Sequence, residues 1–220
     1  MRRQLWQHDD WRPLLLGQSI RLLLEYLGTE YEEKFYNFGP APDFDRSEWL
    51  NEKFKLGLDL PNLPYYIDGD IKITQSHAIL RHLGRQNNMC GKTEKDKIKV
   101  DMLEHQAMDI RMGYIRLIYI TYPTEKDQYL KDFKTTMKAL SDLLGSQPWF
   151  VGDQITFPDF LIYELLSVHL ELDPTCLDKT NNLKEYVKRF EQLPKIKKYL
   201  ESSRFIKAPL NGPMAHHGNI

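Results

Sequence analysis

The spacing of apolar residues divides the chain into two parts. Up to residue 87, short strand-forming runs alternate with runs of helical spacing, whereas beyond it apolar residues recur almost only at helical intervals. Turn-forming residues at positions 87–91 mark the change. The pattern predicts a mixed α/β domain over residues 1–87 and an all-helical domain over residues 88–220.

The first part predicts the order helix, strand, helix, hairpin, helix. Apolar residues from Ile20 to Leu27 have helical spacing, and residues 31–36 have the mixed polarity of a strand. A loop over residues 39–43 then precedes a short helix over residues 45–55, which Asp45 or Ser47 could cap. The architecture also requires one further strand before residue 17.

The stretch from residue 61 to residue 83 carries the clearest functional signal. The pair Asp68-Gly69 lies between two strand-forming runs and predicts a hairpin. Gln75 and Ser76 then open an apolar-periodic run, so unpaired backbone N–H groups, an amide and a hydroxyl meet at the positive end of a helix dipole. Such a helix start suits a small anion. Capping of the helix by Thr74 or Ser76 is the alternative interpretation.

The second part contains several amphipathic helices. Two stripes of apolar residues have helical spacing: Leu103, Ala107, Ile110, Tyr114 and Leu117, then Leu130, Phe133, Met137, Leu140 and Leu144. Gly145 should stop the second helix, and residues 156–159 read as a capping box that starts a third, which ends at Asp173-Pro174. Leu183 begins another helix, and residues 202–220 show no period and predict a tail.

Composition indicates an ordinary globular protein. The 220 residues are 41% hydrophobic, which is enough for a packed core. The net charge of -1 predicts no bulk attraction to nucleic acid or membranes, and no stretch is long enough to span a bilayer. The two cysteines form neither a disulfide framework nor a zinc motif, so the cytoplasm is the expected location. His216-His217 is interpreted as a feature of the tail, and no metal or cofactor is predicted.

Five segments resemble the mu class of the cytosolic glutathione transferases, and the similarity extends over residues 17–220. The segments are IRLLLEY (20–26), APDFDRSEWLNEKFKLGLDLPNLPY (41–65), DGDIKITQSHAILR (68–81), PWFVGDQITFPDF (148–160) and SSRF (202–205). The loop over residues 37–45 is similar to an insertion typical of that class. The resemblance implies a thioredoxin-like α/β domain, an all-helical domain carrying the electrophile site, a homodimer, and glutathione as cosubstrate.

The resemblance also assigns roles to single residues. Gln75 and Ser76 match the positions that bind the γ-glutamyl carboxylate of glutathione, in agreement with the anion site expected from helix physics. Asn62 and Leu63 match the positions that hold its cysteinyl backbone, and Pro64 matches a proline that is cis in the family. The remaining glutathione-binding matches are Trp11, Arg46, Trp49 and Lys53, with Asp109 reaching the glutathione of the other subunit.

Four further matches concern the second substrate and the dimer. Tyr119 matches a hydroxyl that faces the electrophile. Leu60 replaces a phenylalanine that inserts into the partner subunit, and Arg81 and Asp101 match positions that pair across the dimer interface. The implied partners are therefore glutathione, hydrophobic electrophiles and a second copy of the chain.

The N-terminal segment departs from the mu-class pattern. Counting back from Ile20, Asp10 stands where the class has the tyrosine whose hydroxyl lowers the pKa of the glutathione thiol, so no catalytic residue is matched. An ionised carboxylate only accepts hydrogen bonds and repels a thiolate, which predicts impaired conjugation. His8, two residues away, is a candidate replacement donor. Residues 2–10 are also unusually polar for a buried strand, so they form either a poor strand or a gap in the sheet.

Two functions follow from these observations. The first is a glutathione transferase that conjugates the glutathione thiol to hydrophobic electrophiles, as in detoxification. The second is a protein that binds glutathione or hydrophobic ligands without turnover, or that pairs with a competent subunit, and Asp10 favours this second reading. A role as a signalling partner that binds other proteins through its helical face has no sequence feature of its own.

Overall fold

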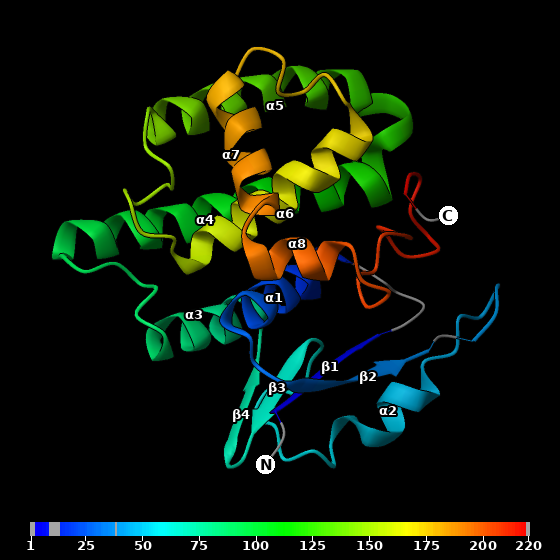
Figure 1. The fold of residues 1–220 in the computed structure, drawn as a ribbon. Helices are drawn as coiled ribbons and strands as arrows, with labels where there is room; N and C mark the ends of the chain where they lie inside the picture. Colours follow the sequence, from blue (N-terminus) through cyan, green and yellow to red (C-terminus); the bar gives the residue numbers. More distant parts are fainter. Residues whose placement is uncertain (1–2, 9–13, 38, 219–220) are drawn as a thin grey trace.

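The computed structural model describes residues 3–8, 14–37 and 39–218, with side chains described from residue 16 onward. The helices α1 and α3 lie between a four-stranded sheet and the helices of the second half of the chain, whereas α2 lies beside the sheet, away from α1 and α3 (Figure 1). The strands are β1 (Arg3–His8), β2 (Tyr31–Tyr36), β3 (Tyr65–Asp68) and β4 (Ile71–Thr74). The helices of this half are α1 (Leu14–Leu27), α2 (Ser47–Lys53) and α3 (Ser76–Gln86).

The strand order is β2-β1-β3-β4, so β1 is an inner strand. It pairs in parallel with β2 and antiparallel with β3, from Arg3 opposite Tyr31 to His8 opposite Tyr36. Residues 3–8 therefore form the strand that the architecture requires, and in the described part of the sheet they fill the place between β2 and β3. Pairing on both sides satisfies the backbone of this strand, which a weak apolar pattern alone does not reveal.

The predicted hairpin is confirmed, with its turn one residue later than expected. Asp68 pairs with Ile71, so the two linking residues are Gly69 and Asp70. Gly69 has φ +61°, which a glycine adopts without the steric cost that a side chain would bring. The pairing also continues to Tyr65 opposite Thr74, at the end of the hairpin nearest α3.

Two predicted helix caps are wrong. The short helix α2 is shorter than expected, and its N-cap is Arg46, although Asp45 accepts a hydrogen bond from the Ser47 N–H at 3.0 Å. In α3 the N-cap is Gln75, and no side chain caps the helix. Neither Thr74 nor Ser76 therefore acts as the cap. The backbone N–H groups in the first turn of α3 thus remain available as hydrogen-bond donors, as at any helix start without a side-chain cap.

The helical half consists of α4 (Glu94–Arg116), a π-helical turn η1 (Leu117–Thr121), α5 (Tyr122–Leu144), α6 (Phe157–Leu172), α7 (Asn181–Glu191) and α8 (Pro194–Leu200). The capping box at the start of α6 is confirmed, because Asp159 accepts hydrogen bonds from the N–H and hydroxyl of Thr156. Gly145 ends α5 with φ +58°. Residues 202–218 form the predicted irregular tail.

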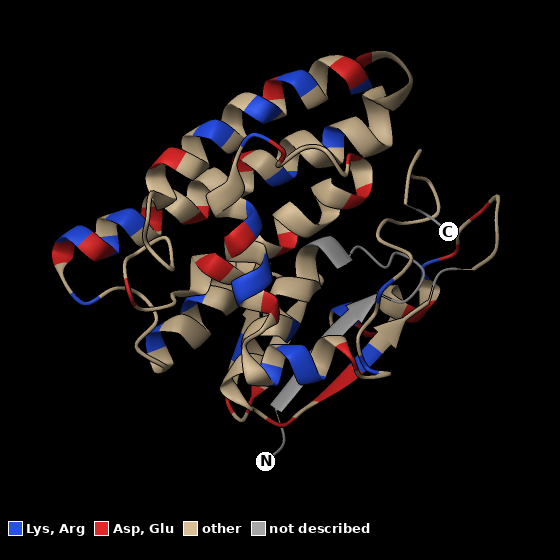
Figure 2. Cartoon of the chain, turned by 45° about the horizontal axis from the view of Figure 1, so that its top comes forward, with Lys and Arg blue, Asp and Glu red and all other residues tan. Residues whose placement is uncertain are grey.

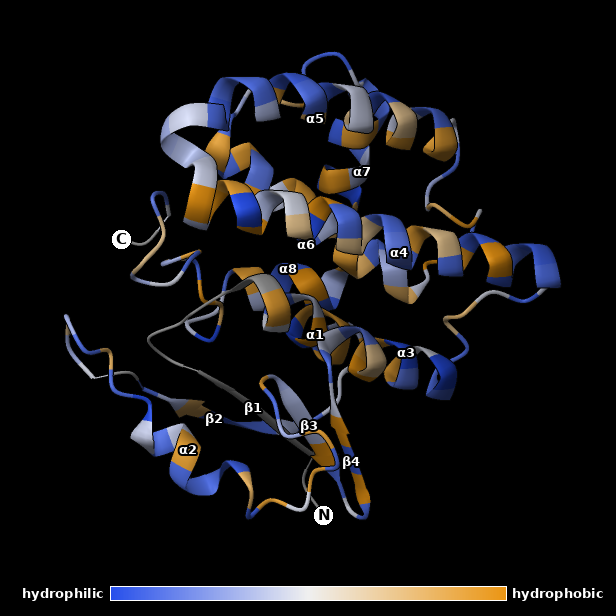
Figure 3. Ribbon diagram, turned by 180° about the vertical axis from the view of Figure 1, so that it is seen from behind, coloured by the Kyte–Doolittle hydropathy of each residue, from blue (hydrophilic) through white to orange (hydrophobic). Residues whose placement is uncertain are grey.

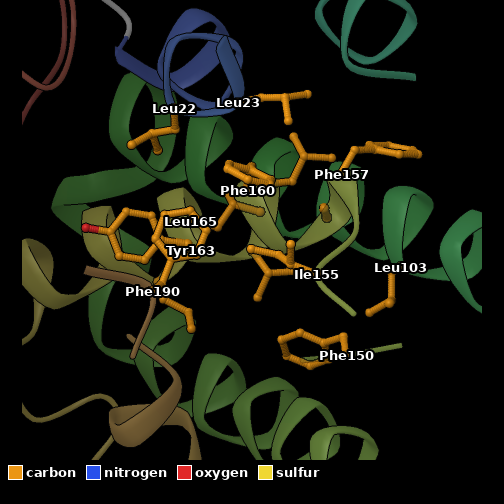
Figure 4. Packing of buried hydrophobic residues seen from close by; sticks show 14 of the residues in the cluster. Leu22, Leu23, Leu103, Phe150, Ile155, Phe157, Phe160, Tyr163, Leu165 and Phe190 are labelled. Atoms are coloured by element: carbon orange, nitrogen blue, oxygen red, sulfur yellow. The ribbon is translucent and has the colours of Figure 1, made fainter. Parts of the chain in front are cut away.

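The main core lies around α6, which is buried on nearly all sides. Both predicted stripes face it, and only Leu130 is partly exposed. Phe190 stacks on Tyr163 at 4.1 Å between ring centroids and meets Phe160 edge-on (Figure 4). The outer helix α5 carries both acidic and basic residues on its outer side (Figure 2). The helices α4 and α5 are amphipathic, with hydrophilic and hydrophobic residues on different sides (Figure 3). Across the described residues, no helix is long and apolar enough to cross a membrane.

Candidate functional site

The centre of the candidate site is the junction between β4 and α3. Gln75 is exposed and has φ +71° and ψ +114°, whereas Ser76 next to it is buried. A residue with a side chain rarely adopts a positive φ, because its Cβ crowds the backbone, and such conformations cost about 1–3 kcal/mol. The surrounding fold therefore holds Gln75 in a strained backbone conformation at the start of the helix.

The pairing of the hairpin brings a second predicted segment to this junction. Because Tyr65 lies opposite Thr74, the residues just before β3 lie beside the residues just after β4. The Leu63-Pro64 peptide bond is cis, as expected, with Asn62 exposed and Leu63 partly exposed. Leu63 and Ser76, two of the residues expected to contact the same ligand, thus flank the same end of the hairpin.

The helix α2 is fixed against the same sheet by a polar network. Glu52 accepts hydrogen bonds from Lys34 at 2.5 Å and from the hydroxyl of Tyr36 at 2.7 Å, and these bonds hold the pKa of Glu52 below its usual range. The Tyr36 and Tyr65 hydroxyls lie 3.0 Å apart. Since Tyr65 follows the cis proline, the network links α2 to the segment that carries Leu63.

Trp49 anchors α2 through apolar contacts. It is only 6% exposed, meets Tyr36 edge-on at 5.1 Å and stacks on Tyr65 at 6.0 Å between ring centroids. Lys53, one turn later, is partly exposed and lies 5.4 Å from the Phe54 ring, and Arg46 is exposed. The helix therefore presents two cations near its ends, while most of the tryptophan belongs to a small core.

Tyr119 lies on the π-helical turn, where the C-terminal tail covers it. Its hydroxyl accepts a hydrogen bond from the Gly212 N–H at 2.8 Å, and burial raises its pKa. The tail is held by further bonds: Asn211 donates to the Tyr114 hydroxyl at 3.0 Å, and the His216 N–H donates to the Ile118 carbonyl at 2.9 Å. The sequence predicted Tyr119 but not these tail contacts, because no periodic pattern exists in residues 202–218.

The expected dimer residues are found at the surface and at the α3–α4 contact. Leu60 is 69% exposed. Arg81 of α3, however, pairs within the same chain with Asp101 at 3.1 Å and with the buried Glu104 of α4. Burial acts to raise the pKa of Glu104, but hydrogen bonds from His77 and Arg81 outweigh it and lower the pKa. Arg81 and Asp101 therefore form an ion pair within the chain, and their pairing across a dimer interface stays a prediction.

The remaining predicted residues contribute less. Asp109 is exposed on α4. Asp10 and Trp11 lie outside the described residues, as does the side chain of His8, so thiol activation stays a prediction from sequence. The described residues contain no group of three or more metal-ligating side chains.

Sequence reasoning missed a set of buried polar groups behind Tyr119. Arg111 of α4 and Glu164 of α6 form a fully buried ion pair, and Tyr129 and His169 are hydrogen-bonded at 2.7 Å. Burial lowers the pKa of His169 to about 4. In the sequence, Arg111 and Glu164 each stand among the apolar residues of a helix. Without the fold, nothing in the sequence shows that these two charged residues pair with each other.

Comparison with known proteins identifies the family. The glutathione S-transferase N-terminal domain matches residues 9–85, and the glutathione S-transferase C-terminal domain matches residues 108–203. Glutathione S-transferase Mu 2 of Macaca fascicularis is 54% identical over 210 residues, covering 95% of this chain and 96% of the relative. The human Mu 4 protein is 54% identical over 205 residues, covering 93% and 94%. The chain belongs to the Mu-class glutathione S-transferases.

Solved structures agree with this assignment. A Pi-class glutathione S-transferase of Onchocerca volvulus aligns with this Mu-class chain at a TM-score of 0.83 and 32% identity, covering 98% of this chain and 100% of the other. The glutathione S-transferase Blo t 8 aligns at a TM-score of 0.84 and 37% identity, covering 98% and 99%. The transferase thus has a thioredoxin-like α/β fold in its N-terminal part and a helical C-terminal part, as predicted.

Proposed function

We propose that this Mu-class transferase holds glutathione at the β4–α3 junction and joins its thiol to hydrophobic electrophiles. Residues 1–87 bind glutathione, and residues 88–220 provide the electrophile site, with Tyr119 facing the second substrate. The observation that carries the proposal is the strained Gln75 beside buried Ser76 at an uncapped helix start. An exposed amide, backbone N–H groups and a positive helix end together suit the γ-glutamyl carboxylate.

The rest of the glutathione site follows the same arrangement. The edge formed by Asn62 and Leu63 holds the cysteinyl backbone, because it precedes β3 at the same end of the hairpin where Ser76 follows β4. Arg46 and Lys53 supply cations for the glycine carboxylate, next to the indole of Trp49. We further propose that the chain is a cytoplasmic homodimer, with exposed Leu60 inserted into the partner and Asp109 reaching the glutathione bound there.

The N-terminal substitution weakens catalysis in this proposal. A free thiol has a pKa of about 8.5, and a donor that lowers it by about two units supplies roughly 2.7 kcal/mol. Asp10 cannot donate when ionised, and loss of a comparable donor costs about 10²- to 10³-fold in rate. We therefore infer impaired conjugation, with Trp11 retained beside the thiol.

The test compares the chain with an Asp10→Tyr variant, measuring glutathione affinity and the rate of conjugation to a chlorodinitrobenzene. We expect similar affinities and a rate that rises about 100-fold in the variant. Equal rates would contradict the inferred role of position 10. A chain that binds glutathione but stays inactive even as Asp10→Tyr would instead support the non-catalytic binding protein or the partner of a competent subunit.

A further inference from the structure

A cavity of about 240 Å³ is lined by residues of α1, α6, the ends of α7 and α8, and residues 205–210 of the C-terminal tail. Its walls are mainly apolar and include Leu22 of α1, Val168 of α6 and Leu210 of the tail. None of the described residues matched to glutathione, the electrophile or the dimer lines it. This volume lies somewhat below the usual range for ligand pockets and suits one aromatic ring with a short side chain.

The charged groups around this cavity are mostly acidic. Glu164 lines it but is balanced by Arg111. Glu171 and Glu191 line it too, and neither forms an ion pair within the described part of the chain. Lys207 is the single basic residue among the lining residues. The more exposed part of the lining therefore carries an excess of negative charge, which favours a cationic group.

A buried hydrogen-bond donor lies in the wall. Gln18 is 5% exposed, and its Oε1 accepts a bond from Arg21 at 3.3 Å, whereas its Nε2 faces the Tyr199 hydroxyl, whose pKa it acts to lower, without forming a hydrogen bond of good geometry among the described residues. Buried donors are rarely left unpaired in proteins, and a ligand oxygen is one way to satisfy them. The hydroxyl of Tyr163, also in the lining, already donates to Glu191.

We propose that this cavity is a second binding site, separate from the glutathione site, for a small apolar amine that carries a ring, a carbonyl oxygen and an ammonium group. The ring lies against Leu22, Val168 and Leu210. The carbonyl faces Gln18, and the ammonium lies between Glu171 and Glu191. The proposal is independent of whether the thiol of glutathione is activated.

The experiment uses the full chain saturated with S-hexylglutathione, which occupies the glutathione site and the space beside it. Two matched probes are titrated: N-aminoethylbenzamide, which is cationic, and hippurate, which has the same ring and amide but is anionic. Binding is followed by NMR at the Gln18 side-chain amide and the Val168 and Leu210 methyl groups. We expect the amine to saturate with a Kd of about 0.1–1 mM and hippurate to bind at least about fivefold more weakly.

Substitutions of residues in and outside the cavity lining show where the amine binds. Ser167→Leu and Leu210→Trp each fill the cavity, from α6 and from the tail, and either folded variant should weaken amine binding at least about tenfold. Glu171→Gln should weaken it about threefold. Glu185→Gln, an exposed acid on α7 that does not line the cavity, should leave it unchanged.

Three results would overturn the proposal. The first is no saturation of the Gln18 and methyl signals by about 10 mM amine. The second is equal binding in the filled variants, and the third is tighter binding of hippurate than of the amine. If S-hexylglutathione itself fails to bind, the glutathione site is refuted, and the amine titration of the unliganded chain still decides the cavity.

Discussion

Replacing Gln75 by glycine should make the protein more stable and its glutathione binding weaker. At φ +71° the side chain of Gln75 costs about 1–2 kcal/mol, which glycine avoids. Glycine also gives the unfolded chain more freedom, which removes about 0.4–1 kcal/mol of that gain. We expect Gln75→Gly to be more stable by about 0.5 kcal/mol in urea unfolding.

The same variant loses the amide that contacts the γ-glutamyl carboxylate. A hydrogen bond to a charged group is worth about 1.5–3 kcal/mol, so glutathione should bind about 10- to 150-fold more weakly in calorimetric titration. Gln75→Ala is the matched control, because it lacks the amide but keeps the strain, and it should show the affinity loss without the gain in stability. If Gln75→Gly were destabilised by more than about 1 kcal/mol, or if its glutathione affinity were unchanged, the role given to this residue would be refuted.

Three further predictions concern the buried polar groups. Glu164→Gln leaves the charge of Arg111 uncompensated and should cost about 3 kcal/mol in urea unfolding; a loss below about 1 kcal/mol would be inconsistent with a fully buried pair. Burial holds the pKa of His169 at about 4, below its ordinary 6.5, so stability present above pH 6.5 is lost as the pH falls towards 4. Relative to His169→Phe, the unmodified chain should lose about 3 kcal/mol across this window, and parallel pH profiles of the two Tm values would exclude the effect. Thr156→Ala should cost about 1 kcal/mol at the buried capping box, and Thr93→Ala at the exposed box of α4 should cost less, as thermal unfolding of both variants can establish.

The elements with a strong period or a strong turn signal were predictable. The strand at 31–36 has the expected bounds, and Gly145, the box at Thr156 and the stop at Asp173 end or begin helices where expected. Each depends on interactions within a few residues, which a sequence records directly. The element β1 was less evident, because its strand character comes from pairing with β2 and β3 and not from its own polarity.

In the candidate site, too, locally encoded features were predictable from sequence and long-range contacts were not. Gln75 and Ser76 were recognised from the helix start, but the positive φ of Gln75 was not, since it results from the junction with the hairpin. The contacts of the tail with Tyr119 and Tyr114 join residues more than ninety positions apart and leave no local pattern. The same holds for the pairing of Arg111 with Glu164, which only the packing of α4 against α6 brings together.

The state of the glutathione thiol in the bound complex tests the account most directly. The ultraviolet absorbance of the thiolate, titrated against pH in the unmodified chain and in Asp10→Tyr, gives the pKa of bound glutathione in each. We predict that both chains bind glutathione, with a thiol pKa at or above about 8.5 in the unmodified chain and about two units lower in the variant. A lowered thiol pKa in the unmodified chain, equal to that of the variant, would contradict the claim that this transferase holds glutathione without activating it fully.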